Sequence, residues 1–255
     1  MSGKVETRNA LTPDMIDHFG VKGWVPARGY VHKTTLAHIE REAEHLTKEV
    51  GQQSSCQYYV DRFANGESRL ARVERIAEHL PTLTTSGLRQ RMAQDAAMVL
   101  KGPVVAFKDK LNIRYPASAG YAPHQDAARW RSFAARFVSF GLFLSASDPE
   151  RGGFSFAQYD LKAGLQATQT GDFDAAVFQG LPREDITAAP GDALIIDGTA
   201  PHCTTRNSGP DRVLHLLFTF ALGADEGARD AYYAAQEQAF EQVRSGNVFT
   251  FPARQ

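Results

Sequence analysis

The sequence predicts a mainly β protein with flanking helices, folded as a double-stranded β-helix, the cupin-like jelly roll. Two observations carry this prediction. Apolar residues recur at helical spacing through much of residues 1–102, whereas residues 103–222 contain short apolar runs separated by Gly, Pro and Asp turns. Residues 223–255 complete the chain, and their segment 225–244, rich in Ala, Glu and Gln, predicts a closing helix. We expect a single domain over residues 1–255.

Start and stop signals define the predicted helices of the N-terminal part. Thr12 is a suitable N-cap, and Pro13 follows it at the first helical position. A second helix is expected over 35–50, where apolar residues recur every three or four positions and charged residues fill the other face. A third is expected over 86–100, and the Gly-Pro pair at 102–103 ends it.

The segment 104–115 shows a clear strand pattern. Its odd-numbered positions are mostly apolar, while the even-numbered positions from 108 onward are all polar. The polar side chains on that face are Lys108, Lys110, Asn112 and Arg114. This face either meets solvent, as one face of many antiparallel sheets does, or lines the interior of the barrel. Further strands are expected over 136–146, 152–159, 192–197 and 212–222.

Composition and charge argue against several classes of protein. The net charge is −1 with basic and acidic residues interspersed, so neither nucleic acid nor an anionic membrane surface is an expected partner. We expect no membrane span, because no run of about 18 apolar residues occurs, and no secretion signal is visible at the N-terminus. Cys56 and Cys203 are expected to be free thiols in a reducing compartment. The expected location is therefore cytoplasmic.

The stretch GYAPHQDAARW places His124 and Asp126 two residues apart in a loop after the polar-faced strand. In an extended chain such residues point to the same side, so both can reach one ion. His202, at the end of a hydrophobic strand, is the expected third ligand at a barrel mouth. Two imidazoles and one carboxylate are typical of non-haem Fe(II) oxygenases, although Zn²⁺ accepts the same ligand types. His215 lies inside an apolar strand, where a hydrogen-bonded core histidine is expected.

Arg212 extends the pattern from a metal site to a co-substrate site. It follows His202 by ten residues and begins the strand 212–222. An iron oxygenase that uses 2-oxoglutarate must bind the distal carboxylate of that molecule, and a guanidinium donates two parallel hydrogen bonds to a carboxylate. Thr204, two residues past His202, lies on the same side of an extended chain and adds a hydroxyl donor. We therefore expect Arg212 and Thr204 to bind 2-oxoglutarate.

Three segments of the chain resemble those of a known family. FKDKLNIRYPASAGYAPHQDAARW and APGDALIIDGTAPHCTTRNSGPDRVLHLLFTF are similar to the two metal-binding segments of bacterial phytanoyl-CoA dioxygenase family proteins, and LTPDMIDHFGVKGWV to the family's N-terminal helix. The resemblance implies an oxygenase that uses Fe(II), 2-oxoglutarate and O2, oxidises an unactivated C–H bond, and releases succinate and CO2. It places iron on His124, Asp126 and His202. It also implies 2-oxoglutarate contacts from Arg212, Thr204, Asn112 and Lys108.

The substrate is predicted only by class. If the polar face of 104–115 lines the barrel, its lysines exceed the need of 2-oxoglutarate and favour an anionic or zwitterionic small polar metabolite, such as an amino acid, a phosphonate or a biosynthetic intermediate. The expected substrate-binding residues are Lys110, Tyr121, Trp130 and Arg136. GGFSFAQYDLKAG stands where many relatives carry a Gly-Ser-His segment. Two alternatives stay open: a cupin-like metalloenzyme that does not use 2-oxoglutarate, and a non-catalytic metal- or ligand-binding module.

Overall fold

A computed structural model describes residues 11–63 and 65–252. Its strands form a nine-stranded sheet and a three-stranded sheet. The large sheet has the order β1 (Trp24–Ala27), β8 (Ala193–Asp197), β5 (Arg136–Phe143), β10 (Val213–Leu222), β4 (Val104–Arg114), β3 (Ser68–Glu74), β2 (Gln57–Arg62), β12 (Val248–Pro252) and β11 (Arg244–Ser245). The small sheet has the order β7 (Arg183–Ile186), β6 (Phe154–Ala157) and β9 (His202–Thr204).

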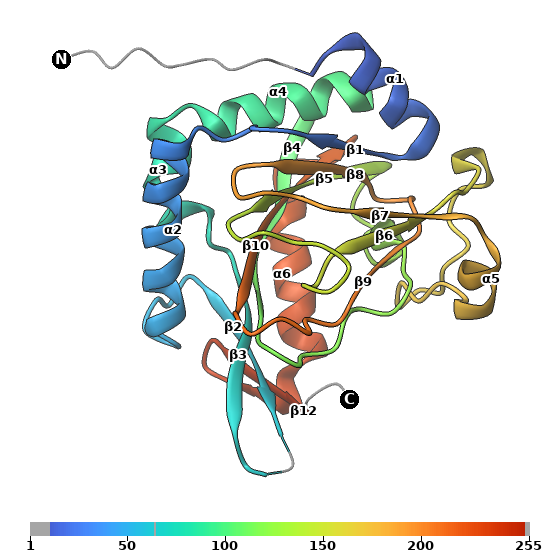
Figure 1. The fold of residues 1–255 in the computed structure, drawn as a ribbon. Coiled ribbons are helices and arrows are strands. Elements are labelled where there is room, and N and C mark those ends of the chain that lie inside the picture. Colours follow the sequence, from blue (N-terminus) through green and yellow to red (C-terminus); the bar gives the residue numbers. More distant parts are fainter. Residues whose placement is uncertain (1–10, 64, 253–255) are drawn as a thin grey trace.

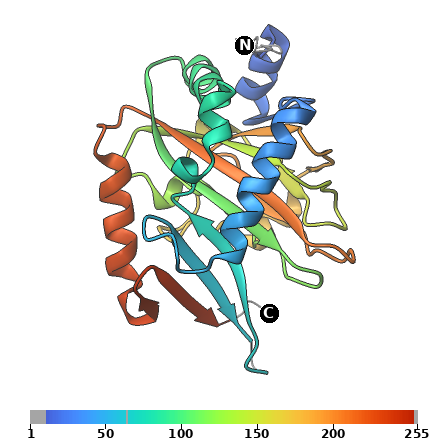
Figure 2. The ribbon, with the colours of Figure 1, turned by 90° about the vertical axis from the view of Figure 1, so that its left-hand side faces the viewer.

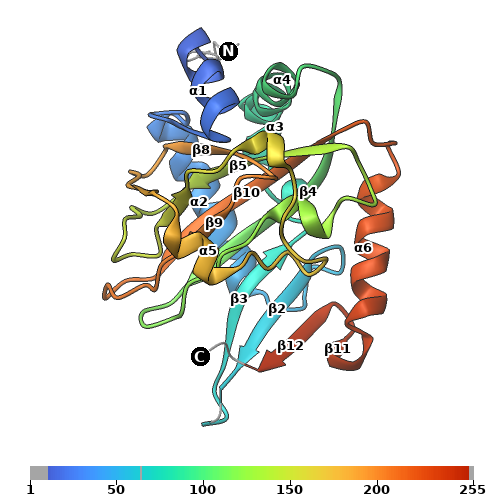
Figure 3. The same ribbon diagram turned by 90° about the vertical axis from the view of Figure 1, so that its right-hand side faces the viewer.

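The N-terminal helices cover one face of the large sheet, and the small sheet lies on the other side (Figures 1–3). The helices are α1 (Pro13–Lys22), α2 (Lys33–Lys48), α3 (Pro81–Thr85), α4 (Leu88–Leu100), α5 (Ala175–Gly180) and α6 (Ala228–Ala239). Figure 2 shows α2 and α4 in front of the sheet, and Figure 3 shows α5 and β9 on the opposite side. Two packed sheets with helices on the outer face confirm the predicted jelly roll.

The predicted start of the first helix is confirmed. Thr12 caps α1, where its hydroxyl accepts a hydrogen bond from the Met15 amide, and Pro13 is the first helical residue. Gly23 ends the helix with a left-handed φ of 79°, which glycine adopts without strain. The predicted third helix, 86–100, corresponds to α4, and the short helix α3 before Gly87 was not predicted.

Several strands lie outside the predicted set. β1, β2 and β3 belong to residues for which the sequence predicts mostly helix, and all three join the large sheet. β2 and β3 pair in antiparallel fashion over short spans, and β12 pairs in parallel with β2 although the two strands are far apart in the sequence. β9 has only three residues. Cys56 and Cys203 are free thiols, as predicted.

Pairing between β4 and β10 determines which side chains reach the interior. His215 pairs with Asn112, Leu217 with Lys110, and Val213 with Arg114. Paired residues in antiparallel strands project from the same face, so the even-numbered residues of β4 share a face with the odd-numbered residues of β10. Leu214, Leu216 and Phe218 occupy the opposite face and pack in the core beneath the helices.

Glu74 is a fully buried carboxylate beside this interior face. Its Oε1 atom lies 3.0 Å from the Lys108 Nζ atom and 3.0 Å from the Arg72 Nε atom. Lys108 also donates a hydrogen bond to the hydroxyl of Tyr232 on α6. Burial by itself would raise the pKa of Glu74, but the cations of Lys108 and Arg72 outweigh it and hold the pKa below its ordinary value. The cluster joins β3, β4 and α6.

Replacing Glu74 with Gln should lower the free energy of unfolding by about 3–5 kcal/mol, because two buried cations lose their counter-ion. A carboxylate with a lowered native pKa stabilises the fold above its ordinary pKa of 4.5, and this stabilisation disappears as the pH falls through the native pKa. Urea unfolding at several pH values measures both effects. The exposed Glu67, paired with Arg69, supplies the control Glu67→Gln, which should leave the urea midpoint unchanged. Equal midpoint shifts for the two variants would contradict the assignment.

Candidate active site

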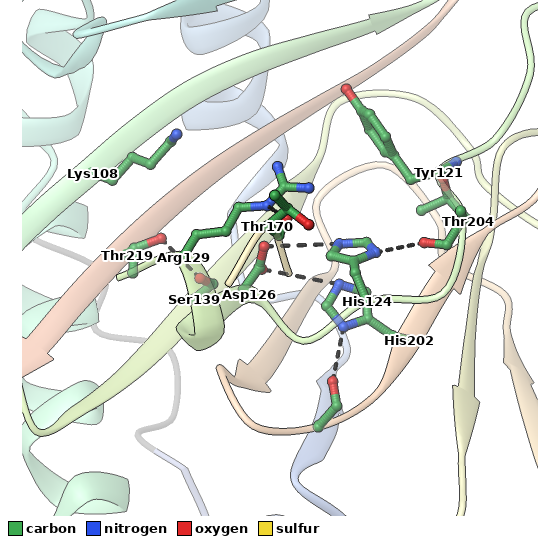
Figure 4. A network of polar contacts seen from close by, with 12 residues as sticks. Lys108, Tyr121, His124, Asp126, Arg129, Ser139, Thr170, His202, Thr204 and Thr219 are labelled. Atoms are coloured by element: carbon green, nitrogen blue, oxygen red, sulfur yellow. Dashed lines mark hydrogen bonds and ion pairs between the residues drawn. The ribbon is translucent and has the colours of Figure 1, made fainter. Parts of the chain in front are cut away.

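His124, Asp126 and His202 come together at one end of the space between the sheets. One ligand atom from each lies within 4.8 Å of the others. The His124 Nε2 atom is 3.8 Å from Oδ1 of Asp126, and the His202 Nε2 atom is 4.0 Å from Oδ2 (Figure 4). The centroids of the two imidazole rings are 4.2 Å apart. This spacing suits three side chains that share one ion.

Backbone carbonyls fix the tautomer of both imidazoles. His124 Nδ1 lies 2.8 Å from the Ala122 carbonyl oxygen, and His202 Nδ1 lies 3.0 Å from that of Ala200. Because a carbonyl only accepts, each Nδ1 carries the hydrogen and each Nε2 keeps its lone pair. Both lone pairs are therefore available to a metal on the side of Asp126.

Backbone hydrogen bonds place the segments that contain His124 and His202 side by side. His124 donates its backbone N–H to the His202 carbonyl at 2.9 Å, and His202 returns the bond at 3.0 Å. This bridge adds the segment at His124 to the edge of the small sheet beside β9. Asp126 then begins a short 3₁₀ turn over Asp126–Arg129, which turns its carboxylate back toward the histidines.

Burial and charge set the protonation that a metal site needs. Burial lowers the pKa of His124, the nearby His202 lowers it further, and burial likewise lowers the pKa of His202. Burial alone would raise the pKa of Asp126, but His124 and Lys110 outweigh it and hold the pKa below its ordinary value. At neutral pH the three residues are therefore two neutral imidazoles and one carboxylate, the forms that bind a divalent ion.

A narrow cavity opens beside the triad. Its lining residues are Lys110, Asn112, Arg114, Tyr121, His124, Asp126, Phe154, His202, Thr204, His215 and Leu217. The polar face of β4 thus lines the interior and not the solvent-exposed surface. Burial lowers the pKa of Lys110 to about 8, and the charge of Asp126 opposes this shift. Of the eight residues predicted from the sequence to bind 2-oxoglutarate or substrate, four line this cavity: Lys110, Asn112, Tyr121 and Thr204.

Two residues expected to contact 2-oxoglutarate lie elsewhere. Arg212 forms an ion pair with Glu44 of α2, on the helix-covered face of the sheet. It precedes Val213, whose pairing with Arg114 places odd-numbered residues of β10 in the cavity and even-numbered ones on the opposite face. Lys108 faces the interior, but its ammonium group is bound to Glu74 and Tyr232. Figure 4 shows it well separated from the triad.

Two residues expected to bind substrate are also outside the cavity lining. Trp130 is buried in an aromatic cluster, with its ring centroid 5.8 Å from that of Phe107 and 5.4 Å from that of Phe137. Arg136 is half-exposed and pairs with Asp197 at 2.8 Å. Both are near the metal segment in sequence, but the short turn after Asp126 directs Trp130 into the core.

The cavity also contains residues to which the sequence assigns no ligand. Arg114 belongs to the predicted polar face, so its position could have been read from strand alternation. His215 is 3 % exposed, and its Nε2 atom is buried with no hydrogen-bond partner among the described residues, unlike the satisfied core histidine expected. The Oδ1 atom of Asn112, on the paired strand β4, is likewise buried with no hydrogen-bond partner among the described residues. Two unsatisfied polar atoms in one cavity indicate a place for a polar ligand.

The sequence profile of a family described as Phytanoyl-CoA dioxygenase (PhyH) matches residues 19–213. The chain belongs to the phytanoyl-CoA dioxygenase family. This membership confirms the resemblance seen in the sequence, together with the prediction of an oxygenase that uses Fe(II), 2-oxoglutarate and O2. Within the described residues, no helix is both long enough and apolar enough to cross a membrane.

Two relatives are similar to this chain in sequence, and two solved structures share its fold. The chain is 28 % identical over 242 residues to methylphosphonate hydroxylase of Gimesia maris, covering 91 % of this chain and 89 % of the relative. It is 23 % identical over 214 residues to 2-aminoethylphosphonate dioxygenase of an uncultured bacterium, covering 83 % and 81 %. AviO1 of Streptomyces viridochromogenes has a similar fold, with a TM-score of 0.68, 20 % identity and coverage of 85 % and 97 %. The epimerase SnoN, in complex with Fe3+, alpha ketoglutarate and nogalamycin RO, gives a TM-score of 0.65 at 18 % identity, covering 84 % and 86 %.

Gln125, between two of the triad residues, connects the segments around the site. Its Nε2 atom donates to the carbonyls of Thr199 at 2.6 Å and Gly164 at 3.2 Å. Its Oε1 atom accepts from the backbone N–H groups of Gln166 and Ala167, both at 2.8 Å. The side chain is fully buried and all four bonds of its amide are made. It therefore fixes the triad segment relative to the loop before His202 and the loop after β6.

Replacing Gln125 with Glu should weaken binding of Co²⁺, used as a spectroscopic probe, by about 10-fold, because an outer shell that orients metal ligands contributes on this scale. The carboxylate would face the carbonyl oxygens of Thr199 and Gly164, which only accept hydrogen bonds. The control is Gln166→Glu on the exposed neighbouring side chain, which should bind Co²⁺ as the parent does. A Gln125→Glu variant with parental affinity and an unchanged Co²⁺ spectrum would rule out this positioning role.

Proposed function

We propose that His124, Asp126 and His202 bind the catalytic iron, and that the substrate is a small phosphonate. The observation that carries the proposal is the combination of the triad with a positively charged cavity. Two cations, Lys110 and Arg114, and a single carboxylate, Asp126, are among the lining residues. A divalent ion adds further positive charge, so the occupied cavity needs anionic ligands.

The triad fits ferrous iron by its donor set. Two neutral imidazoles and one carboxylate on adjacent segments form a facial set, which leaves about three coordination positions for 2-oxoglutarate and O2. When bound, iron supplies oxygen activation, which couples the decarboxylation of 2-oxoglutarate to succinate with oxidation of a substrate C–H bond. Asp126 also keeps the charge of the site compatible with a divalent ion.

The chain's own residues orient the ligands and limit access by water. The carbonyls of Ala122 and Ala200 hold both imidazoles in the metal-binding tautomer. Phe154 and Leu217 supply apolar walls beside the polar groups, and the Phe154 ring lies 6.1 Å from the His202 ring, centroid to centroid. An enclosed, partly apolar cavity protects reactive species from water.

Lys110 is proposed to bind the acid group of the substrate. It lines the same cavity as the triad, and its charge helps to hold the pKa of Asp126 low. A compact ammonium group suits a tetrahedral phosphonate, which needs no planar fork. The two relatives named for methylphosphonate and 2-aminoethylphosphonate support this class of substrate. Tyr121 forms part of the wall of the same cavity.

Anaerobic addition of Fe(II) and 2-oxoglutarate to the apoprotein should produce a metal-to-ligand charge-transfer band in the visible spectrum. His124→Ala and His202→Ala should remove the band, because each deletes a proposed ligand. His45→Ala, on the exposed surface of α2, is the matched control and should retain it. If the parent protein gives no band, or if both triad variants keep it, the proposed iron site is wrong.

Methylphosphonate and 2-aminoethylphosphonate should stimulate succinate release more than acetate and 3-aminopropanoate, their carboxylate counterparts. Lys110→Met should raise the KM for the phosphonate by about 10- to 100-fold, the range for a lost charge-assisted hydrogen bond. Lys162→Met, on the exposed surface, is the control. Coupled succinate assays measure both effects. A preference for neutral or carboxylate compounds, or a Lys110→Met enzyme with the parental KM, would contradict the assignment.

A further inference from the structure

The distal carboxylate of 2-oxoglutarate needs a cation inside the cavity, and the expected Arg212 is not there. Arg212 lies on the face of β10 that meets α2, where its guanidinium pairs with Glu44. Its neighbour on that face, Leu214, belongs to the core beneath the helices. Arg212 immediately precedes β10, whose register with β4 places His215 and Leu217 in the cavity.

Arg114 occupies the cavity from the neighbouring strand. Its residue is 8 % exposed, and it pairs in register with Val213, the residue next to Arg212. One guanidinium nitrogen donates to Thr204 Oγ1 at 2.9 Å, and the other terminal nitrogen donates to the Ala119 carbonyl at 3.0 Å. The guanidinium carbon lies 3.9 Å from the centroid of the Tyr121 ring. These contacts hold the planar fork in one orientation, which lowers the entropy lost when it binds a ligand.

The hydroxyl group of Thr204 has a hydrogen that it can donate to a ligand. Its Oγ1 atom accepts hydrogen bonds from Arg114 and, at 2.8 Å, from the backbone N–H of Tyr121. A hydroxyl has two acceptor positions and one hydrogen, so with both lone pairs in use the hydrogen must point to an acceptor. The described residues make no such contact with it. A carboxylate oxygen beside Arg114 would receive this hydrogen.

Asn112 and His215 are the next polar groups along the same two strands. They pair in register, are 6 % and 3 % exposed, and each has a buried side-chain atom without a hydrogen-bond partner among the described residues. Both lie between Arg114 and the metal end of the cavity, because Asn112 is halfway along β4 from Arg114 to Lys110. A polar ligand that extends from the triad toward Arg114 therefore passes next to both.

The distances along the strands also fit a five-carbon diacid. Thr204 is two residues past His202 on β9, which is roughly 7 Å of extended chain. Lys110 and Arg114 are four residues apart on β4, roughly 13 Å, so they serve opposite ends of the cavity. A dicarboxylate whose keto-acid end is at the triad extends its other carboxylate toward the Arg114 end.

We infer that Arg114 on β4, with the hydroxyl of Thr204, binds the distal carboxylate of 2-oxoglutarate, and that Arg212 has no part in this site. Asn112 and His215 line the cavity between its two ends. The inference rests on the proposed function of the triad. It divides the cavity between two anions, with the co-substrate at Arg114 and the substrate's acid group at Lys110.

The test compares Arg114→Met with Arg212→Met, two matched removals of one guanidinium. Anaerobic titration with 2-oxoglutarate is followed by the charge-transfer band with Fe(II) and, independently, by calorimetry with Mn(II). We expect Arg114→Met to raise the Kd for 2-oxoglutarate by about 10- to 100-fold, the range for a charge-assisted pair. Arg212→Met should keep the parental Kd. Arg114→Lys, which keeps the charge but loses the fork, should lie between the parent and Arg114→Met and serves if the Met variant fails to fold.

A second readout separates ligand recognition from general damage to the cavity. 2-Oxopentanoate has the keto-acid end of 2-oxoglutarate but no distal carboxylate. The parent should bind 2-oxoglutarate far more tightly, and Arg114→Met should lose most of that preference because its affinity for 2-oxopentanoate is retained. A raised Kd for Arg212→Met with a parental value for Arg114→Met and Arg114→Lys would overturn the inference. Absence of 2-oxoglutarate binding in the parent would instead refute the proposed function.

Discussion

The need to neutralise buried positive charge organises this molecule. The face of β4 directed between the sheets carries three basic side chains, Lys108, Lys110 and Arg114, and a buried cation is stable only with a counter-charge or hydrogen bonds. The protein meets this need in two ways. Lys108 has a permanent partner in Glu74, which joins the sheet to α6. Lys110 and Arg114 line the cavity with Asp126, where Arg114 donates hydrogen bonds to Ala119 and Thr204 and bound anions are proposed to supply further counter-charge.

The basic residues of β4 therefore differ in role: Lys108 stabilises the fold, whereas Lys110 and Arg114 are proposed to bind ligands. The ammonium group of Lys108 is bound to Glu74 and to the hydroxyl of Tyr232, and it also lies over the Tyr232 ring. Lys110 and Arg114 instead line the cavity. Arg114 contacts Ala119 in a loop and Thr204 on β9, the strand that also carries His202. The proposed carboxylate anchor Arg114 and the proposed substrate cation Lys110 thus depend on one strand register. A single substitution that alters the pairing of β4 with β10 would disturb both.

Much of the fold and part of the site follow from local sequence patterns. Alternation predicted β4, the capping residues Thr12 and Pro13 predicted α1, and the spacing of His124 and Asp126 indicated two side chains on one side of the chain. Properties that depend on tertiary pairing were not predictable in this way. The turn between β9 and β10 determines which face of the sheet the Arg212 side chain meets. The 3₁₀ turn that begins at Asp126 directs the Trp130 side chain into the core. His215 looked like a core residue because an apolar strand surrounds it, and only pairing with Asn112 reveals that it faces the cavity.

A crystal structure of the chain prepared anaerobically with Mn(II) and 2-oxoglutarate tests the arrangement most directly. We expect the ion on His124, Asp126 and His202, the distal carboxylate within hydrogen-bond distance of the Arg114 guanidinium, and Arg212 still paired with Glu44. Electron density that placed the distal carboxylate on Arg212, or the ion away from the triad, would contradict this arrangement.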